Sequence, residues 1–445
     1  MKKSNEGLWV GFFTVLLCCA LPLNAQDLAT RLAATDYHLS YDDTRTLAVD
    51  VHALAFFKDN EFGGDQATGY TLPGFWLQPR LTYQPLDAIR LEAGFHALVY
   101  NGAGKYPCYA YHDIARWKGT QYQSGAHILP FFRAQAKLRN LTFVLGDIYG
   151  GANHGVVEPL MNPEVNLTQD PEMGFQLLYD LPRYHLDAWI NWQSFIFRED
   201  SHQEAFTVGF SQRIALCGKF DQQGRVPQQA LLPQQQRSSF NLYIPIDILM
   251  QHRGGEIDDT SMGAQTIDNA ALGLGMRWNV NNKVFNGLTA EALALGCWQQ
   301  SGKLWPFKQG LAASATVSAD LFGYPFHRAH TSINNYGQLR IFATALYGKD
   351  FCPIYGAPFF STYSTKTGGT FDHVLTTHVG AEWSHTFAHG YVLGAKVDTY
   401  LCSTGKETLA DGSVLPSAFN NNFSFGIFFR CSPRFLLKRF TTKVK

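Results

Sequence analysis

Two pairs of an acidic residue and a histidine are the residues in this sequence best suited to chemistry. Asp50 and His52 are separated by one residue, and so are His185 and Asp187. A carboxylate beside an imidazole can orient a general base, as a membrane-bound phospholipase, deacylase or protease requires next to its nucleophile. No serine is marked as a partner of either pair, and no G-x-S-x-G motif occurs. The sequence therefore favours a protein that is not an enzyme.

Metal binding has weak support in the sequence. His252 is followed by Glu256 and Asp258, which could join it around a divalent cation, and the adjacent Arg253 could contact a lipopolysaccharide phosphate. A glycine turn with solvated charges explains the same residues. The pair His327 and His330 has no third ligand nearby, and no C-x-x-C motif occurs. We expect no metal and no cofactor.

The elements that position these residues are predicted to be β-strands. In the stretch 89–99, Ile89, Leu91 and Phe95 alternate with Arg90 and Glu92, which gives one apolar and one polar face. Sixteen stretches of this kind occur: 47–57, 75–84, 89–99, 128–138, 141–148, 175–180, 185–193, 205–212, 241–251, 270–278, 288–295, 311–320, 339–347, 375–383, 391–400 and 423–430.

The connections between these stretches alternate in length, and this pattern distinguishes a membrane barrel from a soluble β-sandwich. Connections after odd strands are mostly long, as at 101–126 and 149–173, whereas several after even strands are tight, as at 86–87 and 139–140. Tight turns on one side and long loops on the other are typical of outer-membrane barrels. We predict an all-β, antiparallel up-and-down transmembrane barrel of about 16 strands, with 14 or 18 still open.

The N-terminus predicts export. Lys2 and Lys3 precede an apolar run from Leu8 to Leu23, and Ala25 offers a cleavage point, as in a Sec signal peptide. The predicted organisation is a signal peptide at 1–25 and a barrel at 26–445, with strands over about 46–430 and a short polar C-terminal tail. Both termini are expected in the periplasm. The formal net charge of 0 gives no reason to expect nucleic acid as a partner.

With these strands and loops the chain resembles porin-like outer-membrane barrels of Gram-negative bacteria. The resemblance implies an aqueous lumen and a third long loop that folds inward to face a basic wall, where facing charges would filter ions. An ordinary external loop, with the arginines paired to Asp50 or Glu92, is the alternative. The pore-lining candidates are Arg80, Arg90, Glu92, Arg133, Lys137, Asp50 and His52, and the candidates in the constriction loop are Asn153, His154, Glu158, Glu164, Asp170 and Glu172.

Three functions follow from this interpretation. The first is a passive or weakly selective channel for small hydrophilic solutes. The second is a non-conducting surface barrel that binds polysaccharide or a secretion partner, using loop aromatics such as Tyr106 and Trp117. The third and least favoured is a lipid-modifying enzyme. Outer-membrane lipid and lipopolysaccharide are expected partners in every case. We expect the aromatic girdles at the membrane interfaces to include Trp76, Trp189, Trp192 and Trp278.

Overall fold

The architecture comes from a computed structural model of the chain. It describes residues 27–100, 125–195, 203–220, 239–255, 263–280, 282, 284–322, 337–387 and 391–440. The predicted signal peptide, the loop aromatics Tyr106 and Trp117, the acidic pair Glu256 and Asp258, and the histidines His327 and His330 lie outside the described residues.

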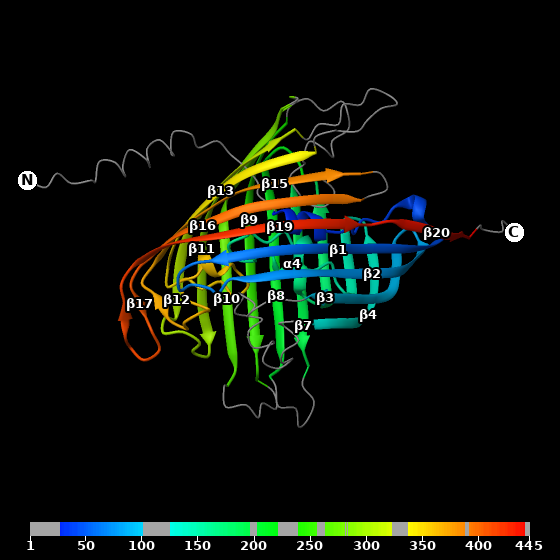
Figure 1. Ribbon diagram of the computed structural model, residues 1–445. Helices are drawn as coiled ribbons and strands as arrows, with labels where there is room; N and C mark the ends of the chain where they lie inside the picture. The colour runs from blue at the N-terminus through cyan, green and yellow to red at the C-terminus, as the bar shows by residue number, and fades with distance from the viewer. Residues whose placement is uncertain are drawn as a thin grey trace, which may run out of the picture.

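Sixteen strands close into one antiparallel barrel, which confirms the predicted fold class and strand number (Figure 1). Each strand pairs with the next in the chain, and β1 pairs with β19 over residues 53–62 to close the ring. The barrel strands are β1 (Thr46–Phe62), β2 (Tyr70–Leu86), β3 (Ile89–Tyr100), β4 (Gly125–Leu138), β5 (Leu141–Asp147), β6 (Met173–Leu181), β7 (Tyr184–Ser194), β8 (Ala205–Cys217), β9 (Ser239–Arg253), β10 (Gln265–Asn279), β11 (Phe285–Ser301), β12 (Gln309–Leu321), β13 (Gln338–Lys349), β15 (Val374–Thr386), β16 (Val392–Thr404) and β19 (Ala418–Cys431).

The wall is apolar outside and polar inside, the reverse of a soluble protein. On β12, Leu311 and Val317 are exposed, while the alternate residues Ser314, Thr316 and Ser318 are buried in the lumen. The same alternation runs round the barrel, so the outer surface forms a belt that only lipid can cover. Exposed apolar side chains of this belt include Phe75, Phe95, Phe132, Leu145, Phe210, Ile248, Leu272, Ile341, Val397 and Ile427.

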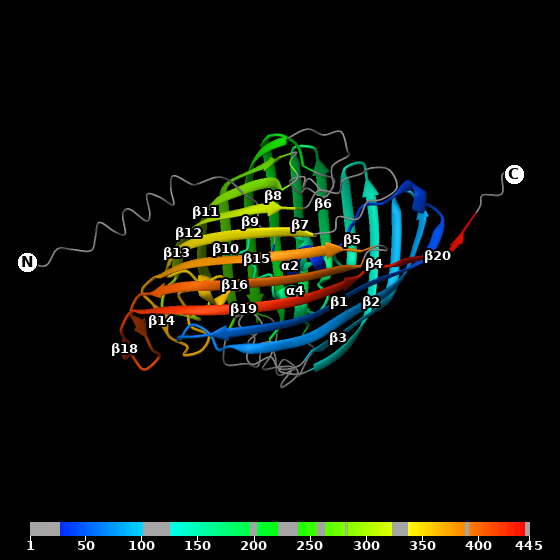
Figure 2. The ribbon, with the colours of Figure 1, turned by 45° about the horizontal axis from the view of Figure 1, so that its top comes forward.

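The strands cross steeply on opposite sides of the ring. In Figures 1 and 2, β1, β2 and β19 run across β7 to β10 on the far wall, as the tilt of strands in a closed barrel requires. One end carries the tight turns, such as the two residues between β4 and β5; we call it the short-turn end. The opposite end, which we call the long-loop end, carries a small sheet of β14 (Thr370–Phe371), β17 (Glu407–Thr408) and β18 (Val414–Leu415).

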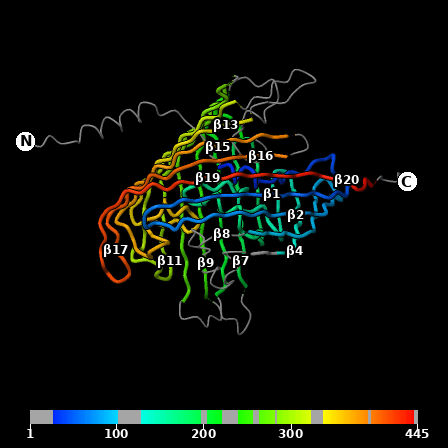
Figure 3. The backbone as a smooth tube through the Cα atoms, in the orientation of Figure 1, coloured from blue at the N-terminus to red at the C-terminus, as the bar shows by residue number. Residues whose placement is uncertain are grey.

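A further strand lies beyond the predicted barrel region. Where β19 ends, β20 (Arg434–Arg439) continues along β1 and pairs with residues 46–50 at the short-turn end (Figure 3). The predicted polar tail thus begins as an ordered strand. Its alternation was not visible in the sequence because Phe435, Leu436 and Leu437 are consecutive apolar residues.

Two short α-helices lie inside the ring of strands (Figure 2). The α-helices are α2 (Leu28–Ala33) and α4 (Val165–Thr168), which contact each other, and the 3-10 helices are η1 (Tyr41–Asp43), η3 (Gly151–Asn153) and η5 (Pro358–Phe360). None of the helices in the described part of the chain is long and apolar enough to cross a membrane.

Candidate functional site

The lumen is packed by three segments that fold into it. They are the N-terminal segment (residues 27–39), the third loop (residues 148–172) and the seventh loop (residues 350–373). The two loops meet through a parallel bridge between Met161 and Tyr355, and Asn162 donates its backbone N–H to the Tyr355 carbonyl at 2.7 Å. The Tyr355 hydroxyl reaches Thr207 on β8 at 2.5 Å. The interior is therefore a packed core.

The N-terminal segment is held in the lumen by buried ion pairs. Asp27 caps α2 through the Ala29 N–H at 2.7 Å and pairs with Lys396 on β16. Burial opposes ionisation of Asp27, but the Lys396 ammonium outweighs it and holds the pKa of that carboxyl below its usual range. Arg31 pairs with Glu382 on β15 at 2.8 Å. These contacts fix α2 against the wall.

His154 fixes the third loop to the opposite wall. Its Nδ1 lies 2.8 Å from Asp187 on β7, and its Nε2 lies 3.0 Å from Glu172. The imidazole also stacks on Trp189, with 3.5 Å between ring centroids. Burial disfavours the charged ring, but the two carboxylates outweigh burial and raise the pKa of His154 to about 9. A histidine that stays charged at neutral pH serves as a structural cation here and not as a base.

In neither of the two predicted pairs does the histidine contact the aspartate that the sequence assigned to it. Asp50 accepts a hydrogen bond from the Thr82 hydroxyl at 2.6 Å, and Asp187 lies against His154. His185 contacts Asp180 at 2.7 Å instead. Residues two apart on a strand share a face, but a residue directly opposite on the next strand lies closer, and His185 is directly opposite Asp180 on β6.

The pore-lining candidates lie on the luminal face of β1 to β4. Arg80 and Arg133 both contact Glu92, at 3.5 and 3.0 Å. This is the cross-strand pairing that the sequence left open as the alternative to a basic wall. The Arg90 guanidinium donates to the His38 carbonyl at 2.7 Å, so the N-terminal segment covers it. Lys137 is partly exposed on the same face.

The acidic residues of the third loop are divided among different partners. Glu158 contacts His378 on β15 at 3.2 Å, and Glu164 binds Lys58 and Tyr70. Glu172 accepts from His154 and from the Gly151 N–H at 2.8 Å. Asn153 accepts from the Thr35 N–H at 2.9 Å. Most of the loop is thus fastened to neighbours other than the arginines.

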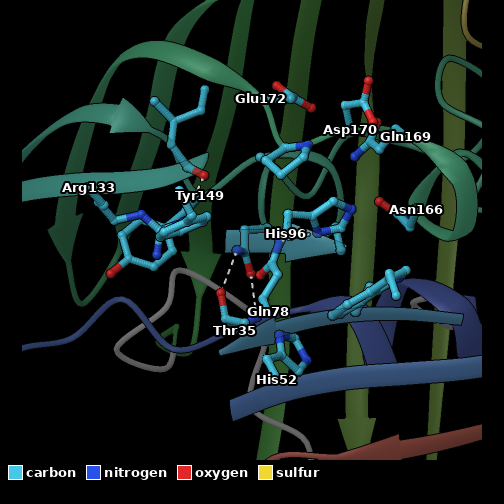
Figure 4. A pocket seen from close by; sticks show the side chains of 18 of the residues that line it. Thr35, His52, Gln78, His96, Arg133, Tyr149, Asn166, Gln169, Asp170 and Glu172 are labelled. Atoms are coloured by element: carbon cyan, nitrogen blue, oxygen red, sulfur yellow. Dashed lines mark hydrogen bonds between the residues drawn. The ribbon is translucent and has the colours of Figure 1, made fainter. Parts of the chain in front are cut away.

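Asn153, Asp170 and Glu172 share one cavity with Arg80, Arg133 and His52. The cavity encloses about 570 Å³, its opening included, between β1 to β4 and the third loop. Figure 4 shows His52, Gln78 and His96 on one side and Asn166, Gln169 and Asp170 on the other. Trp76 also lines it and is buried, as is Trp189, so the prediction that these two tryptophans form girdles was wrong; Trp278 is exposed on the outer surface.

A second polar group lies on the outer surface, and we call it the rim cluster: His252, Thr266 and Ser301. His252 Nδ1 lies 2.8 Å from the Thr266 hydroxyl, and Nε2 lies 2.7 Å from the Gly254 carbonyl. The Ser301 hydroxyl donates to Thr266 Oγ1 at 3.0 Å. The three side chains come from three neighbouring strands, β9, β10 and β11, and meet at the long-loop end.

Strand register assembles the rim cluster. His252 pairs directly with Thr266 across β9 and β10, and both point away from the lumen, since their neighbours Gln251 and Ile267 face inward. Between β10 and β11 the pairing shifts, so that Thr266 faces Ser301 although Ile267 faces Gln299. The residue between them is a bulge, which turns Ser301 towards Thr266.

The rim cluster lies at the edge of the apolar belt. His252 is twelve residues along β9 from Phe240 at the short-turn end, which corresponds to about 28 Å of height for a strand rising ~3.3 Å per residue at a ~45° tilt. The apolar belt of such a barrel is about 25 Å tall. The ring centroids of Phe206 and His252 lie 4.9 Å apart, and those of Trp192 and Phe206 lie 5.0 Å apart. A row of aromatic rings therefore flanks the cluster.

The sequence alone singled out His252 but missed its partners. The expected ligands Glu256 and Asp258 lie outside the described residues, and no group of three or more His, Cys, Asp or Glu suited to a metal ion occurs among the described ones. Thr266 and Ser301 are 14 and 49 residues away along the chain. The signal that could have found Thr266 is hairpin register, because His252 and Thr266 are equally far from the middle of the connection between β9 and β10.

Together these features define a transmembrane antiparallel barrel with a filled lumen and a histidine and hydroxyl cluster on its lipid-facing surface. A family model described as lipid A 3'-O-deacylase-type matches residues 39–440. This match spans all sixteen barrel strands, and the chain belongs to that family. Among curated proteins, none matches the chain.

Three solved structures align with the chain at low sequence identity. OccAB3 of Acinetobacter baumannii aligns with a TM-score of 0.44 and 11% identity, over 87% of this chain and 99% of that one. OprD of Pseudomonas aeruginosa aligns with a TM-score of 0.42 and 10% identity, over 93% and 98%. OmpT of Vibrio cholerae gives a TM-score of 0.41 and 10% identity, over 89% and 100%.

The family corrects the expectation that the protein is not an enzyme. The matching family is one of lipid-modifying enzymes, so that expectation was wrong. The sequence argument failed because it required a nucleophile near a histidine in the chain. In a barrel the side-chain neighbours of a histidine are set by strand pairing, as His252 and Thr266 on neighbouring strands show.

Proposed function

We propose that this protein is an outer-membrane hydrolase that removes an ester-linked acyl chain from a glycolipid of the lipid A class, at the rim cluster. One observation carries the proposal: a histidine and a threonine hydroxyl lie 2.8 Å apart on the lipid-facing surface, at the edge of the apolar belt. The family supports a deacylase, and this cluster combines a base and a hydroxyl where an acyl ester of a membrane lipid would lie.

The hydrogen bonds of His252 suit a general base. A backbone carbonyl only accepts, so Nε2 must carry the proton that it donates to Gly254. In the neutral ring Nδ1 is then the acceptor, and the Thr266 hydroxyl donates to it. A base within hydrogen-bond reach of a hydroxyl, itself oriented by a third group, is the arrangement of an activated nucleophile.

The proposed reaction has two steps. The Thr266 oxygen attacks the ester carbonyl while its proton passes to His252 Nδ1, and collapse of the tetrahedral intermediate returns that proton to the departing sugar hydroxyl. The acyl chain is then esterified to Thr266. Water attacks this ester with His252 again taking the proton, which releases a carboxylic acid and restores the Thr266 hydroxyl. The Ser301 hydroxyl hydrogen-bonds to Thr266 Oγ1 and positions it.

The topology that suits this reaction has the long-loop end outside the cell and the termini in the periplasm, after export through Sec. The rim cluster would then lie at the level of the outer leaflet, where glycolipid acyl esters meet the headgroups. Phe206 and Trp192 would flank the acyl chains, since aromatic rings favour the membrane interface.

The packed lumen favours a hydrolase over a passive channel. A channel needs a continuous water-filled path, but the third loop, the seventh loop and the N-terminal segment share buried contacts across the interior, such as those of Tyr355 and His154. A surface barrel that binds polysaccharide would use the second long loop, whose aromatics lie outside the described residues.

Release of fatty acid tests the proposal. Purified barrel in mixed micelles with lipid A should liberate a fatty acid detectable by mass spectrometry, and His252→Gln should lower the rate by at least about 100-fold. His185→Gln is the matched control, because His185 lies in the lumen beside Asp180 and should leave the rate unchanged. Equal activity of His252→Gln and the wild type would refute the proposed site.

A further inference from the structure

The luminal cavity of Figure 4 is lined by several side chains with polar atoms that neither the fold nor the proposed reaction uses. It lies inside the barrel, whereas the rim cluster lies outside the wall. Its lining is mixed, with amides, two histidines, two arginines, two carboxylates and a tryptophan. The principal lining residues are His52, Gln78, His96, Arg80, Arg133, Trp76, Asn153, Asn166, Gln169, Asp170 and Glu172.

Three of these side chains carry buried polar atoms without a hydrogen-bond partner among the described residues. They are His52 Nε2, Arg80 Nε and Asn166 Oδ1. All three residues are less than a tenth exposed. A buried polar atom without a partner is destabilising, so such atoms need a reason to persist. Three of them around one cavity indicate that the cavity receives a hydrogen-bonding ligand.

The chemical types of these atoms restrict the ligand. Arg80 Nε can only donate and Asn166 Oδ1 can only accept. His52 Nε2 can donate or accept, depending on the tautomer of the ring. A ligand that both donates and accepts at several points satisfies this set. Hydroxyl groups have that property, since each has one donor and two acceptor positions.

Charge around the cavity argues against an ionic ligand. Arg80 and Arg133 lie on the strand side, and Asp170 and Glu172 lie on the side of the third loop. An anion would be repelled by the carboxylates and a cation by the guanidinium groups. Trp76 adds an apolar surface to the lining, of the kind that packs against the C–H groups of a sugar ring.

We propose that this cavity is a binding site for a small neutral polyhydroxylated molecule of the monosaccharide class. The site is independent of the proposed hydrolysis, because its residues lie on β1 to β4 and the third loop, far along the sheet from β9 to β11.

Saturation-transfer NMR on the refolded barrel tests this site. The barrel is placed in a detergent without sugar headgroups, such as a dimethylamine oxide, and probed with D-glucose, D-galactose, N-acetyl-D-glucosamine and myo-inositol at millimolar concentration. Inorganic phosphate and methylammonium serve as charged comparison probes. At least one neutral probe should receive saturation, and phosphate and methylammonium should compete with it poorly.

Two variants connect that binding to the cavity. His52→Phe and Asn166→Leu should each weaken binding by at least 10-fold, and Asn166 lies on the third loop, where a change does not interrupt a barrel strand. His185→Phe makes the same change as His52→Phe on a luminal histidine outside the cavity and should bind normally. Absence of binding by all four neutral probes, stronger binding of a charged probe, or unchanged binding in both variants would each overturn the proposal.

Discussion

Asp320 and Thr266 are both buried polar side chains of the barrel wall, but they lie on opposite faces of it. Asp320 on β12 faces the lumen, where Arg277 and Arg340 donate to its two oxygens at 2.6 and 2.7 Å. Thr266 faces the lipid side, where the surrounding belt is apolar and its partners are His252 and Ser301. The first residue belongs to a dense network and the second to an isolated cluster.

The difference shows where function can be sought in a barrel of this kind. Most polar residues in the lumen have a structural reason to exist, because they bind one another and the backbone of the inward loops, although three atoms at the luminal cavity have no such partner among the described residues. The rim cluster contains three hydrogen-bonding side chains, and the loop group that His252 contacts is the Gly254 carbonyl. A histidine and a hydroxyl on that surface are therefore better evidence for chemistry than the many acid and histidine contacts inside.

The largest effect on activity is expected when the same isosteric change, threonine to valine, is made on the lipid-facing and on the luminal face of the wall. Thr266→Val removes the proposed nucleophile and should lower fatty acid release by at least about 100-fold. Thr207→Val removes a luminal hydroxyl that contacts Tyr355 and should leave the rate within about 2-fold while costing about 1 kcal/mol of stability. If the two variants lose activity equally, the contrast between the faces is wrong.

The second-largest effect is expected on stability, when a luminal ion-pair network is broken. Asp320→Asn leaves Arg277 and Arg340 without their shared carboxylate and should lower the free energy of unfolding by about 3–5 kcal/mol, measured by urea titration in micelles. Asp65→Asn is the control, because Asp65 and Lys366 form an exposed pair at 3.1 Å of the kind that contributes about 0–1 kcal/mol. Similar losses in both variants would contradict a stabilising network in the lumen.

The sequence predicted the wall well and the interior poorly, for a physical reason. All sixteen strands were predicted because a wall between lipid and lumen imposes a period of two residues on each strand. The burial of His154 between Asp187 and Glu172 could not be predicted, since it depends on how the third loop folds back. Trp76 was misplaced because its residue type suits a girdle as well as a lumen, and only its face on β2 decides between them.

Only part of the candidate site could be predicted from the sequence, for a related reason. His252 stood out by residue type, but Thr266 is an ordinary strand residue until the register of β9 against β10 is known. Placing Ser301 beside Thr266 also requires the bulge between β10 and β11, and the alternation of apolar and polar residues does not predict that bulge. Chemistry assembled across neighbouring strands is hidden from any search for short motifs.

The smallest effect is a pH dependence confined to the third loop. The pKa of His154 is raised to about 9 by Asp187 and Glu172, from an ordinary value near 6.5. The raised pKa corresponds to about 3 kcal/mol of local stability, which is fully present below pH ~6.5 and is lost as the pH rises through 9. Hydrogen exchange of residues 150–157 should therefore accelerate between pH 8 and 10, after correction for the intrinsic rate.

The variant His154→Gln removes the titration and should make that corrected exchange fast at every pH in this range. Fatty acid release should not follow the same profile, because the rim cluster lies on the other face of the wall and, within the described part of the chain, shares no hydrogen bond or ion pair with His154. A coincident rise in exchange and fall in activity through pH 9 would mean that the third loop supports the reaction. The two faces would then be coupled, and the lumen would be part of the enzyme's working structure.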